Sequence, residues 1–186
     1  MNFSSRGLTA IALAVTAAAA ISTAQILRLD LNQMVAKTSD TVYGKIAQKH
    51  VTRIDHPVDG NELYFTTLSI EGQSLESGKP ITTDVVFMGG FVDAEHGAFN
   101  SEAPSADDTK VGNQVVCFYK YTENMGGDFA GNEIVTWHGG IYRTFTRGGN
   151  VIVQGRGEGY AIPSNITLAD LKAQVAAAVK VKGAGR

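Results

Sequence analysis

The chain has 186 residues, with 16 Lys and Arg, 18 Asp and Glu and a formal net charge of −2. This balance offers no basic surface for DNA or RNA, so we expect no nucleic-acid partner. The single Cys, Cys117, leaves no internal disulfide to form, and a packed core therefore has to stabilise the fold.

The first 24 residues have the pattern of a secretory signal peptide. A short start with one basic residue, Arg6, precedes an apolar run over residues 8–21, and the small residues 22–24 follow. This predicts cleavage after Ala24. A retained anchor is the alternative, but a run of about 14 residues is short against the roughly 20 that cross a bilayer. We expect a secreted or periplasmic protein with no transmembrane segment after cleavage.

A short helix is expected at the start of the mature chain. Asp30 can cap it, and Leu31, Met34 and Val35 fall on one face at helical spacing. Period-two alternation of apolar residues then predicts strands over residues 42–54, 63–70 and 81–88.

The second half of the chain also indicates strands. Residues 114–121 are apolar on both alternating faces, which predicts a central strand covered on both sides. Paired Gly residues predict two tight hairpins. One turns at residues 138–140, between strands 133–137 and 141–145. The other turns at residues 148–150 and leads into a strand over 151–153.

The end of the chain indicates a C-terminal amphipathic helix. Thr167 and Asp170 have the spacing of a capping box. An apolar stripe follows, formed by Leu168, Leu171, Val175 and Val179. Residues 25–180 are thus predicted to form one mainly β domain, a small antiparallel OB-like β-barrel with a helix at each end. Residues 181–186 are expected to be a flexible tail.

Residues 92–112 form the longest irregular segment, and it is acidic. Asp93, Glu95 and His96 lie close together in it, and such side chains can hold Ca²⁺ or another divalent metal. Their spacing matches no EF-hand, and acidic loops are usually solvated. We therefore expect no cofactor and keep a metal site at these residues as the alternative.

Three further features invite a chemical interpretation. Cys117 lies inside an apolar strand, which favours a small core residue over a nucleophile. The glycines of residues 155–159 are not followed at once by a helix, which favours a turn over a phosphate loop. Trp137 and His138, beside paired glycines, are the candidate ligand-binding residues.

The segment Ser39–Ile46 is similar to the opening of many exported bacterial proteins of unknown function, in which a helix leads into such a strand. Gly89-Gly90, Ala103-Pro104 and Gly112, which precedes an apolar strand, continue the likeness. The order also resembles the oligonucleotide-fold barrel of netrin-like domains, which include the tissue inhibitors of metalloproteinases. The resemblance covers residues 31–153 and implies an OB-like architecture.

One departure from that family bears on function. The resemblance associates those inhibitors with an N-terminal Cys that engages the protease metal, whereas the mature chain is expected to begin at Gln25 with no Cys nearby. Inhibition by that chemistry is not expected. The sequence therefore predicts an exported, non-enzymatic module that binds a protein or small ligand in the cell envelope. The alternative is a metal-dependent or hydrolytic extracytoplasmic enzyme whose site is assembled from distant residues such as Asp93, His96 and His138.

Overall fold

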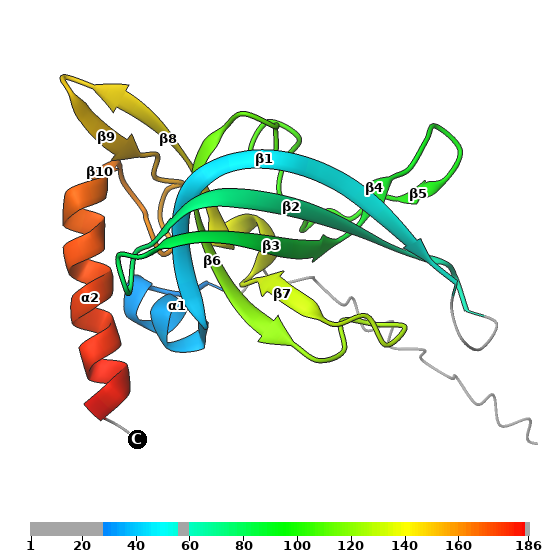
Figure 1. The fold of residues 1–186 in the computed structure, drawn as a ribbon, viewed down its shortest axis with the longest axis horizontal. Helices are drawn as coiled ribbons and strands as arrows, with labels where there is room; N and C mark the ends of the chain where they lie inside the picture. The colour runs from blue at the N-terminus through cyan, green and yellow to red at the C-terminus, as the bar shows by residue number, and fades with distance from the viewer. Residues whose placement is uncertain (1–27, 56–59, 185–186) are drawn as a thin grey trace, which may run out of the picture.

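The computed structural model describes residues 28–55 and 60–184 (Figure 1). The predicted signal peptide lies outside the described residues. Within the described ranges, no helix combines the length and apolar character needed to cross a bilayer.

Five strands close into a barrel. They are β1 (Asp40–Ile54), β2 (Leu63–Ser74), β3 (Pro80–Met88), β6 (Gln114–Thr122) and β7 (Gly131–Ile134). β1 pairs antiparallel with β2 through residues 42–54 and with β6 through residues 40–45. β2 pairs with β3, and β6 pairs with β7. A parallel contact between Val86 of β3 and Glu133 of β7 completes the circle. The predicted barrel of mainly β structure is confirmed.

The remaining elements extend this barrel. They are α1 (Leu31–Lys37), β4 (Gly90–Phe91), β5 (Gly97–Ala98), η1 (Trp137–Gly140), β8 (Ile141–Arg147), β9 (Asn150–Val153), β10 (Ile166–Thr167) and α2 (Leu168–Ala184). β4 and β5 form a small hairpin, and β8, β9 and β10 continue the large sheet beyond β6. In Figure 1 the two helices lie at one end of the molecule and the β4–β5 hairpin lies at the other.

The predicted hairpin at residues 138–140 is wrong. β7 pairs with residues 119–122 of β6, and β8 pairs with residues 115–117 along the same edge. The chain therefore runs on in one direction from β7 to β8, and residues 136–140 form an excursion between two halves of what is nearly one strand. The second predicted hairpin is confirmed, because Gly148 and Gly149 adopt positive φ between paired Arg147 and Asn150.

Two hydrophobic clusters stabilise the barrel. One fills its interior and includes Ile46, Leu68, Val85 and Cys117, all fully buried. The other lies on the opposite face of β6, where Phe118 and Tyr142 pack with residues of both helices; the buried helical members are Met34, Val35, Leu171, Val175 and Ala178. β6 is thus covered on both sides, as its apolar pattern predicts. Burial raises the pKa of Cys117, which suits a core residue.

Both helices have the predicted starts. Asp30 caps α1, and its carboxylate accepts a hydrogen bond from the backbone N–H of Gln33 at 2.8 Å. Thr167 accepts one from the backbone N–H of Asp170 at 3.1 Å. α2 continues to Ala184, past the expected end at residue 180, and Nζ of Lys182 donates to the carbonyl of Thr38 just beyond α1. The helix thus includes most of the segment expected to be a flexible tail.

Two glycines allow the close crossing of β1 and β2. Gly44 and Gly72 are paired across the two strands. A Cβ added at Gly72 would collide with the backbone of Tyr43 and Gly44, and one at Gly44 would collide with that of Glu71. Side chains at this point would force the strands apart.

We expect Gly72→Ala to destabilise the protein by at least about 2 kcal/mol, because the added methyl group meets backbone atoms that cannot rotate away. Urea unfolding measures the loss. Gly183→Ala is the matched control: its Cβ would meet no neighbouring atom, and Ala favours a helix by up to about 1 kcal/mol. Equal stability of the two variants would contradict the close-crossing interpretation.

Candidate functional site

The structure places the candidate metal ligands in the turn between β4 and β5. The carboxylate of Asp93 accepts hydrogen bonds from the backbone N–H groups of Glu95 and His96 and lies 2.9 Å from Nδ1 of His96. The first of these contacts is the largest reason that the pKa of Asp93 lies below its usual value. Glu95 contributes a backbone group to this turn. The hydrogen bonds of Asp93 close the hairpin, and this is the role that the geometry gives it.

No group of three or more metal-ligating side chains occurs in residues 28–55 and 60–184. Asp93, His96 and His138 are therefore not brought together. The assembled site that the enzyme alternative needs is not formed by these residues. A metal at Asp93, Glu95 and His96 would likewise lack a third ligand placed beside the other two.

Trp137 and His138 lie in the excursion between β7 and β8. Thr136 and Trp137 have φ of 52° and 48°, a left-handed conformation that is costly for residues with a side chain. This backbone turns the indole of Trp137 toward Glu133, which accepts a hydrogen bond from Nε1 at 3.0 Å. Burial acts to raise the pKa of Glu133, but hydrogen bonds from Trp137, Thr122 and Lys120 outweigh it and hold the pKa below its usual range.

His138 connects three parts of the chain. Its Nδ1 lies 3.1 Å from the carbonyl oxygen of Glu102, which can only accept, so Nδ1 carries the proton. In the neutral ring, Nε2 then accepts a hydrogen bond from the hydroxyl of Tyr160, 3.0 Å away. Both ring nitrogens of His138 are thus used within the protein. The identification of Trp137 and His138 as ligand contacts stays a prediction.

Residues 99–113, which we name the roof segment, lead from the β4–β5 hairpin to β6. Hydrogen bonds attach this segment at points along its length. Asn100 donates to the carbonyl of Met88, and the carbonyl of Glu102 accepts from His138. Nearer its end, Lys49 donates to Thr109, and Ile46 bonds with Gly112 and Asn113 through backbone groups. The roof segment is therefore fixed on several sides.

Asp108 is the strongest of these attachments. Its carboxylate is buried and accepts from Arg156 at 2.8 Å and from Ser105 at 2.7 Å, with Arg143 at 3.2 Å. Burial acts to raise the pKa of Asp108, but the hydrogen bonds and the two guanidinium groups lower it by more. Arg156 also donates to the carbonyl of Ile141. The glycine-rich segment at 155–159 thus supplies an anchor for the roof segment.

A pocket of about 460 Å³ lies between the roof segment and the inner face of the barrel. Residues of β1, β2 and β3 form its floor: Lys49, Val51, Thr66 and Phe87. These positions lie on the face of the sheet that lines the barrel interior, because Lys49 is paired with buried Leu68 and Phe87 with Thr66, and Lys49 itself is exposed there. Its other walls come from the β4–β5 hairpin and the roof segment, and they include Phe91, Ala98, Phe99, Ala103, Pro104 and Ala106.

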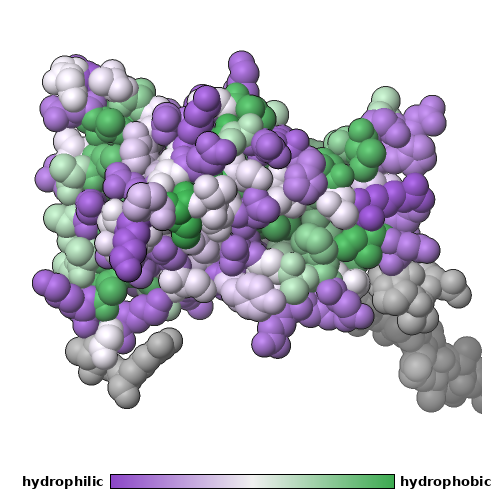
Figure 2. Space-filling model, in the orientation of Figure 1, coloured by the Kyte–Doolittle hydropathy of each residue, from purple (hydrophilic) through white to green (hydrophobic). Residues whose placement is uncertain are grey.

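Hydrophobic side chains also surround the opening of this pocket. Phe91 is 56% exposed and Phe99 is 83% exposed, which is unusual for residues of this size. Figure 2 shows hydrophobic surface over the β4–β5 hairpin, among more polar surroundings. An apolar cavity bordered by exposed aromatic rings has the form of a small-molecule site.

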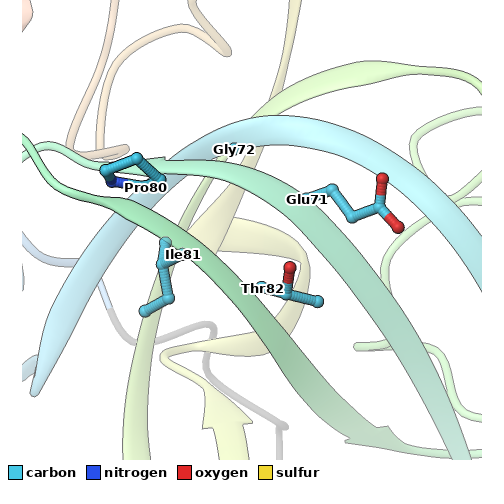
Figure 3. Close-up of a pocket in the computed structure, with 5 residues that line it drawn as sticks. All are labelled: Glu71, Gly72, Pro80, Ile81 and Thr82. Carbon is cyan, nitrogen blue, oxygen red and sulfur yellow. The ribbon is translucent and has the colours of Figure 1, made fainter.

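A second pocket, shown in Figure 3, has a volume of about 350 Å³. Its lining residues are Glu71, Gly72, Pro80, Ile81 and Thr82, and all five come from the neighbouring strands β2 and β3. Because no lining residue comes from a third element, this surface does not enclose a ligand. The pocket beneath the roof segment is the stronger candidate.

Sequence reasoning missed this pocket. The sequence pattern indicates that Lys49 is one polar residue of a strand and that residues 99–113 form a solvated loop. No match appears when the chain is compared with models of protein families, with curated proteins or with solved structures. The function is therefore inferred from the geometry of the pocket.

We expect Asp108→Asn to destabilise the protein by roughly 2 kcal/mol, because it leaves Arg156 without its charge partner. The partly exposed guanidinium groups keep the loss below that of a fully buried pair. Asp107→Asn, at the exposed neighbouring residue, should change little. Since the pKa of Asp108 is lowered on folding, its stabilisation is present at neutral pH and lost as the pH falls through the lowered value. Urea unfolding at several pH values checks both effects, and equal losses in the two variants would refute them.

Proposed function

We propose that this protein is an exported, non-enzymatic binding module whose pocket beneath the roof segment holds a small, largely apolar ligand. One observation carries the proposal: the pocket is enclosed by a segment that the protein's own hydrogen bonds and ion pairs already hold in place. Such a preformed site does not need to order a loop when its ligand arrives, so less binding free energy is lost.

The size and lining of the pocket support a small ligand. A volume of about 460 Å³ lies within the usual range for sites that take small molecules or cofactors. Val51, Phe87 and Pro104 present apolar surface to it. A protein partner would instead need a broad contact area, and the exposed rings of Phe91 and Phe99 are confined to the pocket opening.

We further propose that the barrel is of the oligonucleotide-fold type. Its order, β1-β2-β3-β7-β6 with β6 returning to β1, supports this assignment, as does the number of strands. A fold does not fix a function. The proposed ligand follows from the pocket and not from this resemblance.

A neutral fluorescent probe, phenylnaphthylamine, tests the binding proposal. We expect it to bind the wild-type protein with a rise in fluorescence, as apolar probes do on leaving water. Val51→Trp should weaken binding at least about tenfold by filling the floor of the pocket. Val92→Trp adds the same side chain at an exposed position outside the lining and should bind as the wild type does.

Thermal unfolding of both variants establishes that each is folded. Absence of probe binding to the wild type would refute the proposal. Equal binding by folded Val51→Trp protein would place the site elsewhere.

The proposed export has a separate test. Mature protein from the native host should begin at Gln25, because the signal peptidase is expected to cut after Ala24. N-terminal sequencing of the purified protein identifies the first residue. Protein that retains Met1 would contradict both the cleavage and the proposed location in the periplasm or outside the cell.

A further inference from the structure

The pocket beneath the roof segment has an unbalanced charge. Among the described residues that line it, Lys49 alone carries a charge, and neither Asp nor Glu contributes to the lining. The nearby carboxylate of Asp108 is occupied by Arg156 and Arg143. A ligand therefore meets one cationic group in otherwise apolar and neutral surroundings.

The ammonium group of Lys49 has hydrogen-bonding capacity to spare. It donates to Oγ1 of Thr109 at 2.9 Å, and an ammonium group has three N–H donors. The salt bridges of the described residues include none from Lys49. Partial burial lowers the pKa of Lys49, as expected for a charge that is incompletely solvated and unpaired.

Four neutral polar side chains of the lining, those of Thr66, Asn100, Ser105 and Thr109, already donate hydrogen bonds within the protein. Thr66 donates to the carbonyl of Gly89, and Asn100 donates to that of Met88. Ser105 donates to Asp108, and Thr109 donates to the carbonyl of Ser105. Lys49, within β1, is therefore the charged donor of the lining that has N–H groups to spare.

We propose that the ligand is an amphipathic anion, whose negatively charged group binds Nζ of Lys49 while its apolar body lies against Phe87, Phe91 and Phe99. This inference rests on the proposed function, that the pocket binds a small ligand. A carboxylate, sulfonate or phosphate ester would supply the same chemistry. A neutral apolar ligand would cover the ammonium group without pairing it, which costs free energy, and a cationic ligand would be repelled.

Two probes with the same apolar body separate these cases. Anilinonaphthalene sulfonate carries an anionic group, and phenylnaphthylamine has the same fused rings and aniline without it. We expect the wild-type protein to bind the sulfonate more tightly. Lys49→Met keeps the length of the side chain and removes the charge, and it should weaken sulfonate binding on the order of tenfold, the effect of one charge-assisted hydrogen bond. Binding of the neutral probe should stay unchanged or improve.

Two further variants act as controls. Lys49→Arg keeps the positive charge and should retain most of the preference for the sulfonate. Lys45→Met removes an exposed charge from the same strand at a position outside the pocket lining, and it should behave as the wild type does. Thermal unfolding confirms that each variant is folded.

The outcomes distinguish this inference from the proposed function. If the neutral probe binds and Lys49→Met leaves the preference between the probes unchanged, the pocket binds ligands but does not select anions, and this inference is overturned. If the neutral probe does not bind the wild type, the proposed function itself fails. Loss of the preference in Lys49→Met but not in Lys45→Met supports the inference.

Discussion

The carboxylate of Asp108 is the constraint on which the candidate site depends. It lies in a segment with little regular secondary structure, and it meets guanidinium groups from two later parts of the chain, Arg143 of β8 and Arg156 beyond β9. Without this contact, the charged groups would have to be solvated, and the roof segment would lose its firmest attachment. The pocket beneath the roof segment depends on these ion pairs, because they hold an irregular segment of the chain in a fixed position.

The excursion between β7 and β8 also holds the roof segment in place, through the contact between His138 and Glu102. β7 and β8 pair with adjacent parts of the same edge of β6, and residues 136–140 interrupt what would otherwise be one continuous strand. The chain instead accepts the cost of left-handed Thr136 and Trp137, and it thereby brings His138 to the carbonyl of Glu102. Backbone strain of this kind persists where the surroundings over-determine it, and here Glu133, Glu102 and Tyr160 do so.

The sequence predicts the elements whose signals are local. Asp30 with Gln33, the alternation in β1 and the glycine pair at 148–149 each lie within a few residues of the structure that they produce. The hairpin at 138–140 fails for the opposite reason. Paired glycines are typical of a reversal, but the shared edge of β6 decides where β7 and β8 pair, and that edge is distant in sequence.

The candidate site could not be predicted from neighbouring residues, because its contacts also join residues that are distant in sequence. The ion pairs of Asp108 join residues 35 and 48 positions apart, and Lys49 meets Thr109 across 60 positions. Neither the buried role of Asp108 nor the free donors of Lys49 can be seen in the residues beside them. The acidic character of residues 92–112 suggested a metal, whereas its buried carboxylate binds arginine.

The double pairing of β1 has a consequence for the order of folding. β1 needs β6 as well as β2, and residues 40–45 find their partners at 114–119, a separation that only a long loop closure can span. The barrel cannot close until the chain has emerged as far as β7, whose parallel contact with β3 comes last in sequence. Barrels dominated by such distant contacts fold slowly, in milliseconds to seconds. A chain that closes late leaves the edges of β1 and β3 unpaired until β6 and β7 are available.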